Sequence, residues 1–208
     1  MSESKSIAII GDVHGNVEAL SGILRLVAGR FSHLVLVGDY VNRGPNSASV
    51  IQILIDRIKA GTPLTCVAGN HDLAFRRCLD EGKLIQFLRI GGAATIKSYV
   101  STPDSDLLQQ LQEAVPDEHK EFLRSLYPYF RYRELLVTHS REDPGMTSNS
   151  FHVFGHIPQT DLRPKITANW AAIDTGCGTL RQGRLTCMLW PSLKVIQVDS
   201  SGVEINAQ

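Results

Sequence analysis

The chain has 208 residues, of which 43% are hydrophobic and 20% charged, as is typical of a globular protein that buries its own core. Basic and acidic residues number 21 each, so no net field favours nucleic acid or an anionic membrane surface as a partner. No apolar run approaches the about 20 residues that span a bilayer, and the opening MSESKS lacks the apolar core of a signal peptide.

The four cysteines, Cys66, Cys78, Cys177 and Cys187, show neither a CxxC pair nor the spacing of a metal finger. Cys66 and Cys187 lie in strand-like apolar runs, where a buried, reduced thiol is the expected state. We therefore expect a cytoplasmic protein. Because the chain shows no internal repeat and no linker, we also expect a single domain over residues 1–208.

The first third of the chain alternates strands with helices. Apolar strands are predicted at 6–10, 33–37 and 64–68. A helical pattern begins near Val17 and ends at Gly29, and a second one, centred on residues 50–58, ends before Gly61 and Pro63. This order predicts parallel strands with helices covering the faces of the sheet.

The rest of the chain is predicted to be helical first and extended afterwards. The pattern is mainly helical from Leu73 to Tyr132, with breaks at GGAAT and near Pro103. Strand-like runs follow at 134–138, 152–155, 170–174, 184–190 and 194–198. Their close spacing and their β-branched and aromatic content suggest hairpins.

Each of the three opening strands ends in a similar polar phrase: GDVHG, GDYVNRG and GNHD. Taken alone, the first phrase also fits a helix cap followed by a solvated turn. Polar residues beyond the carboxyl ends of parallel strands nevertheless lie where open α/β sheets build their sites. We therefore expect Asp12, His14, Asp39, Asn70 and His71 to converge on one crevice. Two later strand-like runs also end in histidine, His139 and His156.

Together these phrases resemble those of the calcineurin-like metallophosphoesterases. Within that group the chain is most similar to the bacterial branch of the phosphoprotein phosphatase (serine/threonine phosphatase) family. The resemblance extends to GGAATIKSY and to the closing IDTGCGTLRQGRLTCMLW. It implies an α/β fold with a β-sandwich core, helices on the outside and a dimetal site at the strand ends.

The resemblance also implies two divalent metal ions, for which Mn²⁺ is the first choice and Fe or Zn²⁺ the alternatives. Asp12, His14 and Asp39 would hold the first ion, with water completing its shell. The second would be held by Asp39 together with Asn70, His139 and His156. A hydroxide bridging the two ions would attack the phosphate in line.

The implied catalytic and substrate-binding residues are Arg43, which would clamp the phosphate, and His71, which would act as the general acid. Asn42 stands where the family usually has an aspartate that charges this histidine. Its amide oxygen can still accept from the imidazole N–H but adds no negative charge, and Asp72 could substitute for the missing carboxylate. Arg141 is the candidate for a second phosphate-binding arginine.

The first functional hypothesis is a phosphoprotein phosphatase or small phosphomonoesterase, with a phosphorylated protein or small phosphate ester as substrate. The alternative is a symmetrical diadenosine tetraphosphatase, which the tail and the residue at position 42 also resemble and whose leaving group needs little acid help. A non-catalytic scaffold is the third hypothesis, although every implied ligand position is filled. We expect substrate choice to lie in residues 73–132 and 140–151.

Overall fold

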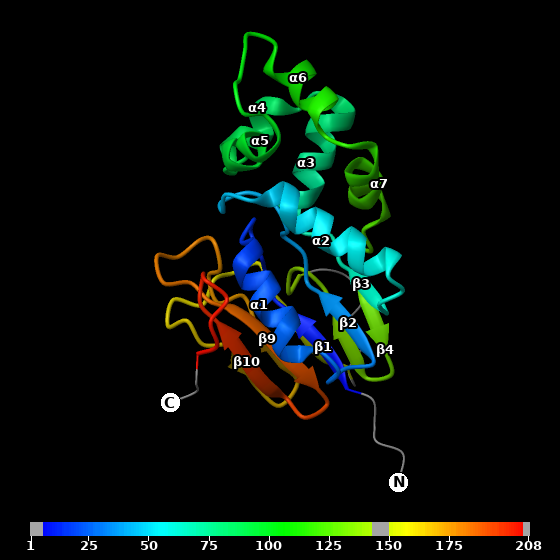
Figure 1. Cartoon of the computed structure of the whole chain (residues 1–208). Helices are drawn as coiled ribbons and strands as arrows, with labels where there is room; N and C mark the ends of the chain where they lie inside the picture. The colour runs from blue at the N-terminus through cyan, green and yellow to red at the C-terminus, as the bar shows by residue number, and fades with distance from the viewer. Residues whose placement is uncertain (1–5, 143–149, 206–208) are drawn as a thin grey trace.

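The structure is a computed structural model that describes residues 6–142 and 150–205. Two five-stranded sheets pack face to face, and the helices lie outside the first of them (Figure 1). The first sheet has the order β10-β9-β1-β2-β3 and the second the order β4-β5-β6-β8-β7. This arrangement confirms the predicted α/β fold with a β-sandwich core.

The predicted alternation at the start of the chain is confirmed. It runs β1 (Ile7–Ile10), α1 (Val17–Val27), β2 (His33–Leu36), α2 (Ser47–Lys59) and β3 (Leu64–Cys66). β1 pairs in parallel with β2, and β2 pairs in parallel with β3. The prediction that helices cover the faces of this sheet holds for one face only. Ala8 and Ile10 pack in the core under the helices, whereas Ile7 and Ile9 face the second sheet.

The later strands are β4 (Phe130–Tyr132), β5 (Leu135–Val137), β6 (Phe151–Phe154), β7 (Lys165–Ile166), β8 (Trp170–Ala172), β9 (Leu185–Trp190) and β10 (Lys194–Val198). β9 and β10 form the expected hairpin. The hairpin prediction is wrong for β5, β6 and β8, which pair in parallel. Strand composition does not encode direction, and here the chain returns to the same end of the sheet before each new strand.

The segment predicted as mainly helical contains α3 (Asn70–Glu81), α4 (Leu84–Arg89), α5 (Ala93–Tyr99), α6 (Leu107–Ala114) and α7 (Asp117–Ser125). It rises beyond the sheets as a group of helices that packs against α2 (Figure 1). The predicted breaks are confirmed, although α5 already begins inside GGAAT. The prediction fails at its C-terminal end, because β4 forms there by antiparallel pairing with β5.

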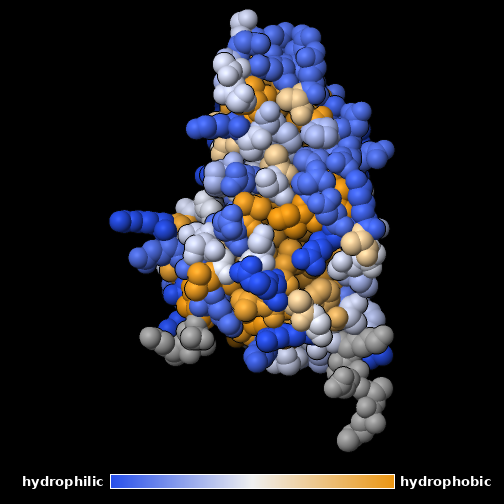
Figure 2. All heavy atoms as spheres, viewed as in Figure 1, coloured by the Kyte–Doolittle hydropathy of each residue, from blue (hydrophilic) through white to orange (hydrophobic). Residues whose placement is uncertain are grey.

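Three further observations concern the surface, the thiols and the length of the helices. Figure 2 shows hydrophilic residues over the upper, helical part of this face and hydrophobic ones gathered lower down, over the sandwich. All four cysteines are free and buried, as expected for Cys66 and Cys187. Within residues 6–142 and 150–205, no helix is long and apolar enough to cross a membrane.

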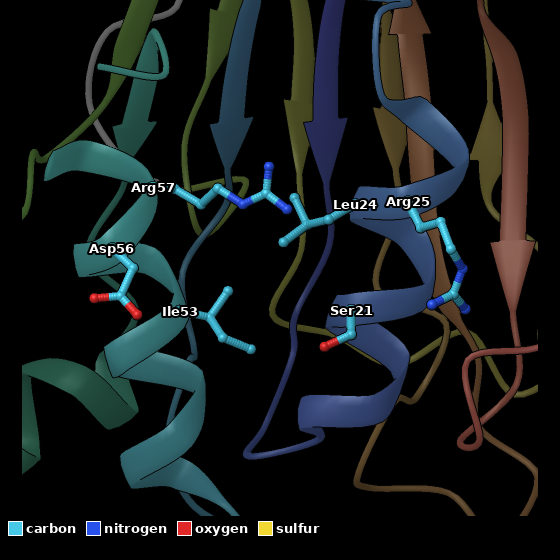
Figure 3. A pocket seen from close by; sticks show the side chains of 6 residues that line it. All are labelled: Ser21, Leu24, Arg25, Ile53, Asp56 and Arg57. Carbon is cyan, nitrogen blue, oxygen red and sulfur yellow. The ribbon is translucent and has the colours of Figure 1, made fainter. Parts of the chain in front are cut away.

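A shallow cavity of about 410 Å³ lies between α1 and α2 (Figure 3). Leu24 and Ile53 face each other across it, with Arg25, Asp56 and Arg57 around them. None of these residues belongs to the strand-end phrases, so the predicted site lies elsewhere.

Candidate metal centre

The first two strand-end phrases are bound to each other through their backbones. The amides of Val13 and His14 donate to the carbonyl of Asp39 at 3.2 and 2.8 Å. The Gly44 amide returns a bond of 2.9 Å to the carbonyl of His14. A Cβ on Gly44 would collide with that same carbonyl, so only glycine allows this approach. The backbone thereby fixes the relative positions of His14 and Asp39.

The backbone of this region is unusual for residues that carry a side chain. Positive φ angles occur at His14 (45°), Asp39 (54°), Asn42 (71°), Arg43 (66°) and His156 (73°). The left-handed region costs free energy for such residues and persists only where the surroundings impose it. Its concentration at five predicted site residues indicates that the fold holds these side chains in a required geometry.

Asp39 lies at the centre of the cluster. Its Oδ2 atom is 3.4 Å from Nε2 of His139, 3.6 Å from Nε2 of His14 and 3.9 Å from Nε2 of His71. Its Oδ1 atom accepts the backbone N–H of His71 at 3.0 Å. One carboxylate oxygen therefore faces three imidazole nitrogens, an arrangement suited to a carboxylate shared by two cations.

Asn70, His139 and His156 gather on the other side of Asp39. The Asn70 Oδ1 atom is 3.0 Å from Nε2 of His139 and 3.1 Å from Nδ1 of His156. The carboxylate of Asp12 accepts the backbone N–H of His156 at 3.1 and 3.3 Å. The fold therefore brings together all six residues predicted to bind metal.

Two groups of side chains place their ligating atoms within 4.8 Å of one another: Asp39 with His14 and His71, and Asp39 with His139 and His156. The second group agrees with the ligand set implied by the resemblance. The first contains His71 where the resemblance implies Asp12. His71 would thus be near enough to act at an ion bound by His14 and Asp39, whereas Asp12 lies beside the backbone of His156.

His14 and His139 are oriented by backbone carbonyls and are neutral, as metal ligands must be. Nδ1 of His14 contacts the carbonyl of Val41 at 3.0 Å, and Nδ1 of His139 contacts that of Val37 at 3.1 Å. Each Nε2 atom is therefore left to face Asp39. Burial lowers the pKa of His14 to about 4 and that of His139 to about 3.

The carboxylates at the centre are buried close to one another, and the charge of Arg43 compensates for them only in part. Burial, followed by the charges of Asp174 and Asp39, raises the pKa of Asp12 well above its ordinary value. Burial, followed by the charge of Asp72, does the same for Asp39. Divalent cations would neutralise these groups, and mixed carboxylate, amide and imidazole donors suit Mn²⁺, Fe or Zn²⁺. The residues present therefore fit a dimetal centre.

Asp174 is a site residue that the sequence analysis missed. It follows β8, and its Oδ1 atom accepts the Gly176 N–H at 2.9 Å. Its Oδ2 atom is buried and has no hydrogen-bond partner in the part of the chain that the structure describes. Burial raises its pKa to about 6. The run WAAID ends in an acidic residue like the other site strands, so this signal was present in the sequence.

We expect Asp174→Asn to stabilise the metal-free protein at pH 8. A pKa raised from 3.8 to about 6 means that folding favours the protonated acid, so this stability is present below about pH 4 and lost as pH rises through 6. Asparagine cannot ionise, so the gain at pH 8 should be up to about 3 kcal/mol and vanish near pH 4. Urea unfolding with a chelator present measures it; a less stable variant at pH 8 would contradict the electrostatic account.

Asp72 does not take the place of the missing aspartate, so that suggestion is wrong. Its Oδ2 atom accepts the backbone amides of Asp39 and Gly69 at 2.8 and 3.0 Å, and its Oδ1 atom accepts that of Tyr40 at 2.9 Å. Burial raises its pKa to about 7. The carboxyl group of Asp72 thus ties the second strand-end loop to the start of α3.

Asn42 does contact His71, but with the polarity opposite to that expected. The amide nitrogen of Asn42, not its oxygen, lies 2.7 Å from Nδ1 of His71, and both residues are buried. Burial, followed by the charges of His14 and Arg43, lowers the pKa of His71 to about 3. The imidazole is therefore neutral and presents Nε2 to the metal cluster.

The two candidate substrate arginines lie in different surroundings. Arg43 is exposed beside the cluster, and its side chain runs past Gly91, where a Cβ would come within 3.3 Å of Arg43 Cδ. Arg141 is exposed as well, but its guanidinium lies over the ring of Trp170 at 5.0 Å. Most of the 140–151 loop expected to contribute to substrate choice lies outside the described residues.

Comparison with known proteins identifies a family and several relatives. A sequence model of the family described as calcineurin-like phosphoesterase matches residues 5–195. A symmetrical bis(5'-nucleosyl)-tetraphosphatase from Pseudomonas fluorescens (strain Pf0-1) is 29% identical over 157 residues, covering 74% of this chain and 47% of the relative. The asymmetrical bis(5'-nucleosyl)-tetraphosphatase PrpE from Halalkalibacterium halodurans is 27% identical over 243 residues, covering 92% and 93%. The chain spans about half the length of the Pseudomonas relative.

Solved structures share the fold. A provisionally assigned diadenosine tetraphosphatase superposes with a TM-score of 0.66 at 20% identity, covering 95% of both chains. A cold-active protein tyrosine phosphatase superposes with a TM-score of 0.64 at 15% identity, covering 97% of this chain and 78% of the other. At such identities the likeness concerns the fold, while the family match covers nearly the whole chain. The chain therefore belongs to the calcineurin-like phosphoesterases, a family of metal-dependent hydrolases.

Proposed function

We propose that this hydrolase cleaves a phosphoanhydride bond of dinucleoside tetraphosphates, the alternative of the two enzymatic hypotheses. Both curated relatives described above are named for this substrate class. The contact between Asn42 and His71 is the structural observation that carries the choice. An amide N–H directed at Nδ1 disfavours imidazolium, so His71 is poorly suited to protonating a basic leaving group. A nucleotide leaving from a phosphoanhydride does not need that proton.

Two divalent cations would supply most of the chemistry, by neutralising phosphate charge and lowering the pKa of bound water. We assign Asp12, His14 and Asp39 to the first ion, with Mn²⁺ as the preferred metal and Fe or Zn²⁺ as alternatives. We assign Asp39, Asn70, His139 and His156 to the second ion.

The remaining residues would act on the substrate. We assign Arg43 to binding a phosphate through its guanidinium, and the Nε2–H of His71 to a hydrogen bond with a phosphate or leaving-group oxygen. Arg141 stays a weaker candidate for phosphate binding, because its guanidinium lies over Trp170. The cytoplasmic location and the single domain expected from the sequence stay predictions.

The test is a parallel turnover assay with Mn²⁺ present. Diadenosine tetraphosphate, a phosphoserine peptide and p-nitrophenyl phosphate are given to the same preparation, with Asp39→Asn as the background control. We expect the highest kcat/KM for the dinucleotide, and product analysis separates two ADP from ATP plus AMP. A higher kcat/KM for the phosphopeptide would overturn this proposal in favour of the phosphoprotein phosphatase, and one for p-nitrophenyl phosphate would favour a small phosphomonoesterase.

Replacing Arg43 should affect the phosphate and leave the metals bound. We expect Arg43→Ala to lower kcat/KM about 10- to 100-fold, since a charge-assisted contact of roughly 1.5–3 kcal/mol is lost. Arg141→Ala serves as the matched comparison, because that arginine packs on Trp170. Metal content is measured for both variants. Unchanged kinetics in Arg43→Ala would return this residue to the role of a solvated loop arginine.

A further inference from the structure

Thr95 connects the helical segment to the metal cluster. Thr95 lies in α5 and is fully buried, and its Oγ1 atom is within hydrogen-bond distance of three polar groups. Oγ1 is 2.8 Å from the backbone nitrogen of Asn42, 2.7 Å from the Oδ1 atom of Asn42 and 3.0 Å from the Oγ atom of Ser47. Although 53 residues separate Thr95 from Asn42 in sequence, this hydroxyl is hydrogen-bonded to both the backbone and the side chain of the asparagine.

The directions of these hydrogen bonds follow from the donors present. The backbone N–H of Asn42 can only donate, so Thr95 Oγ1 accepts from it. The Thr95 hydroxyl hydrogen then goes to Oδ1 of Asn42, and the Ser47 hydroxyl donates to Thr95. With Oδ1 occupied in this way, the amide nitrogen of Asn42 is directed at Nδ1 of His71. In this arrangement the hydroxyl hydrogens of Ser47 and Thr95 and the backbone N–H of Asn42 all have acceptors.

The opposite orientation of the Asn42 amide satisfies fewer groups. Thr95 Oγ1 would then accept from both nitrogens of Asn42 and would donate to Ser47. Ser47 Oγ already accepts the backbone N–H of Asn42 at 3.2 Å, so its own hydrogen would have no acceptor among the contacts found there. Ser47 is fully buried, and a buried hydroxyl without an acceptor is disfavoured.

We propose that Thr95 is a positioning residue that fixes the orientation of the Asn42 amide and thereby places the ring proton of His71 on Nε2. Nδ1 accepts from the amide, so the neutral ring carries its hydrogen on the nitrogen that faces Asp39 and the cluster. His71 then presents a donor to substrate oxygens. If the amide turned over, the hydrogen would move to Nδ1 and Nε2 would present a lone pair instead.

The direct test is the tautomer of His71. Long-range ¹H–¹⁵N spectra of the Zn²⁺-loaded, histidine-labelled full chain distinguish protonated from unprotonated ring nitrogens, and His71→Asn identifies the signals. We expect Nδ1 to be unprotonated in the parent protein and in Thr95→Ser, which keeps the hydroxyl. In Thr95→Val, which has the same shape without the hydroxyl, the Nδ1 and Nε2 signals should shift toward the opposite tautomer.

Matched variants separate this role from packing. Ser98 lies on the same helix as Thr95, and its hydroxyl contacts the Ala48 amide, away from Asn42. The Ser98→Ala variant should therefore keep the parent spectrum. If Thr95→Val does not fold, Thr95→Ala removes the same hydroxyl, and a mixture of tautomers is expected. Ser47→Ala should keep the parent tautomer, because Thr95 still donates to Oδ1 of Asn42.

Kinetics give the second readout. Thr95→Val should lower kcat/KM on the order of 10²-fold with unchanged metal content, whereas Thr95→Ser should restore most of it. A parent spectrum with a protonated Nδ1, or a spectrum that stays the same in the folded Thr95→Val or Thr95→Ala variant, would overturn the inference. This inference rests on the role that the proposed function gives His71, but the spectra are recorded without substrate. Failure to cleave dinucleoside tetraphosphates would therefore refute the proposed function alone.

Discussion

Asp39→Asn is expected to remove both metal ions from the purified protein. The Oδ2 atom of Asp39 is within 3.4–3.9 Å of the Nε2 atoms of three histidines, so one negative charge serves both halves of the cluster. An amide in its place brings no charge and offers one oxygen in place of two. Metal content per chain should fall well below that of the parent, and hydrolysis should fall by at least about 100-fold.

Asp56→Asn is the control for this experiment, because Asp56 is an exposed carboxylate on α2 outside the cluster. Thermal unfolding adds a measurement that does not depend on activity. Since cations that bind only the folded state stabilise it, Mn²⁺ should raise the Tm of the parent and of Asp56→Asn but not of Asp39→Asn. Two metal ions retained per Asp39→Asn chain would show that this carboxylate does not bridge them.

His71→Asn is expected to separate the possible roles of this histidine by leaving group. If His71 protonates the leaving oxygen, poor leaving groups such as phosphoserine should slow by about 10²–10⁴-fold, and p-nitrophenolate should be spared. The structure favours a different result. A neutral ring that donates from Nε2 binds and positions, so both classes should slow to a similar extent. Strong selectivity for poor leaving groups would restore the general acid.

Asn42→Asp is the complementary change. A carboxylate beside Nδ1 favours imidazolium, so the pKa of His71 should rise from its low value. Protonated His71 is then present to higher pH, and the alkaline limb of the rate profile for poor leaving groups should move upward. Turnover of phosphoserine peptides should improve relative to the dinucleotide. A rate profile unchanged by Asn42→Asp would mean that position 42 does not tune His71.

The positions of the metal-binding candidates could be predicted because the signal is local. Each phrase follows an apolar strand within a few residues, and parallel strands present their carboxyl ends at one edge. β1, β2 and β3 pair in parallel, so Asp12, His14 and Asp39 had to lie near one another. The same regularity, applied to WAAID, would have found Asp174.

Other features depended on contacts between distant segments. Helix and strand patterns do not say which layer covers a sheet, so a second sheet was found where helices were expected on the inner face of β1. Strand direction was also unreadable, because the composition of β5, β6 and β8 is the same for parallel and antiparallel pairing.

The sequence by itself determined the family, the apolar strands and the set of ligand-type residues, because each is encoded within a short run of neighbours. The tertiary structure alone decided the hydrogen bonding of those residues. The carboxylate of Asp72 accepts hydrogen bonds from backbone amides, and the side-chain amide of Asn42 donates to His71. The cause in the second case is Thr95, which lies 53 residues from Asn42 and reaches it only when α5 packs against the start of α2. Hydrogen-bond direction depends on every partner around a buried group, and those partners come together only in the folded chain.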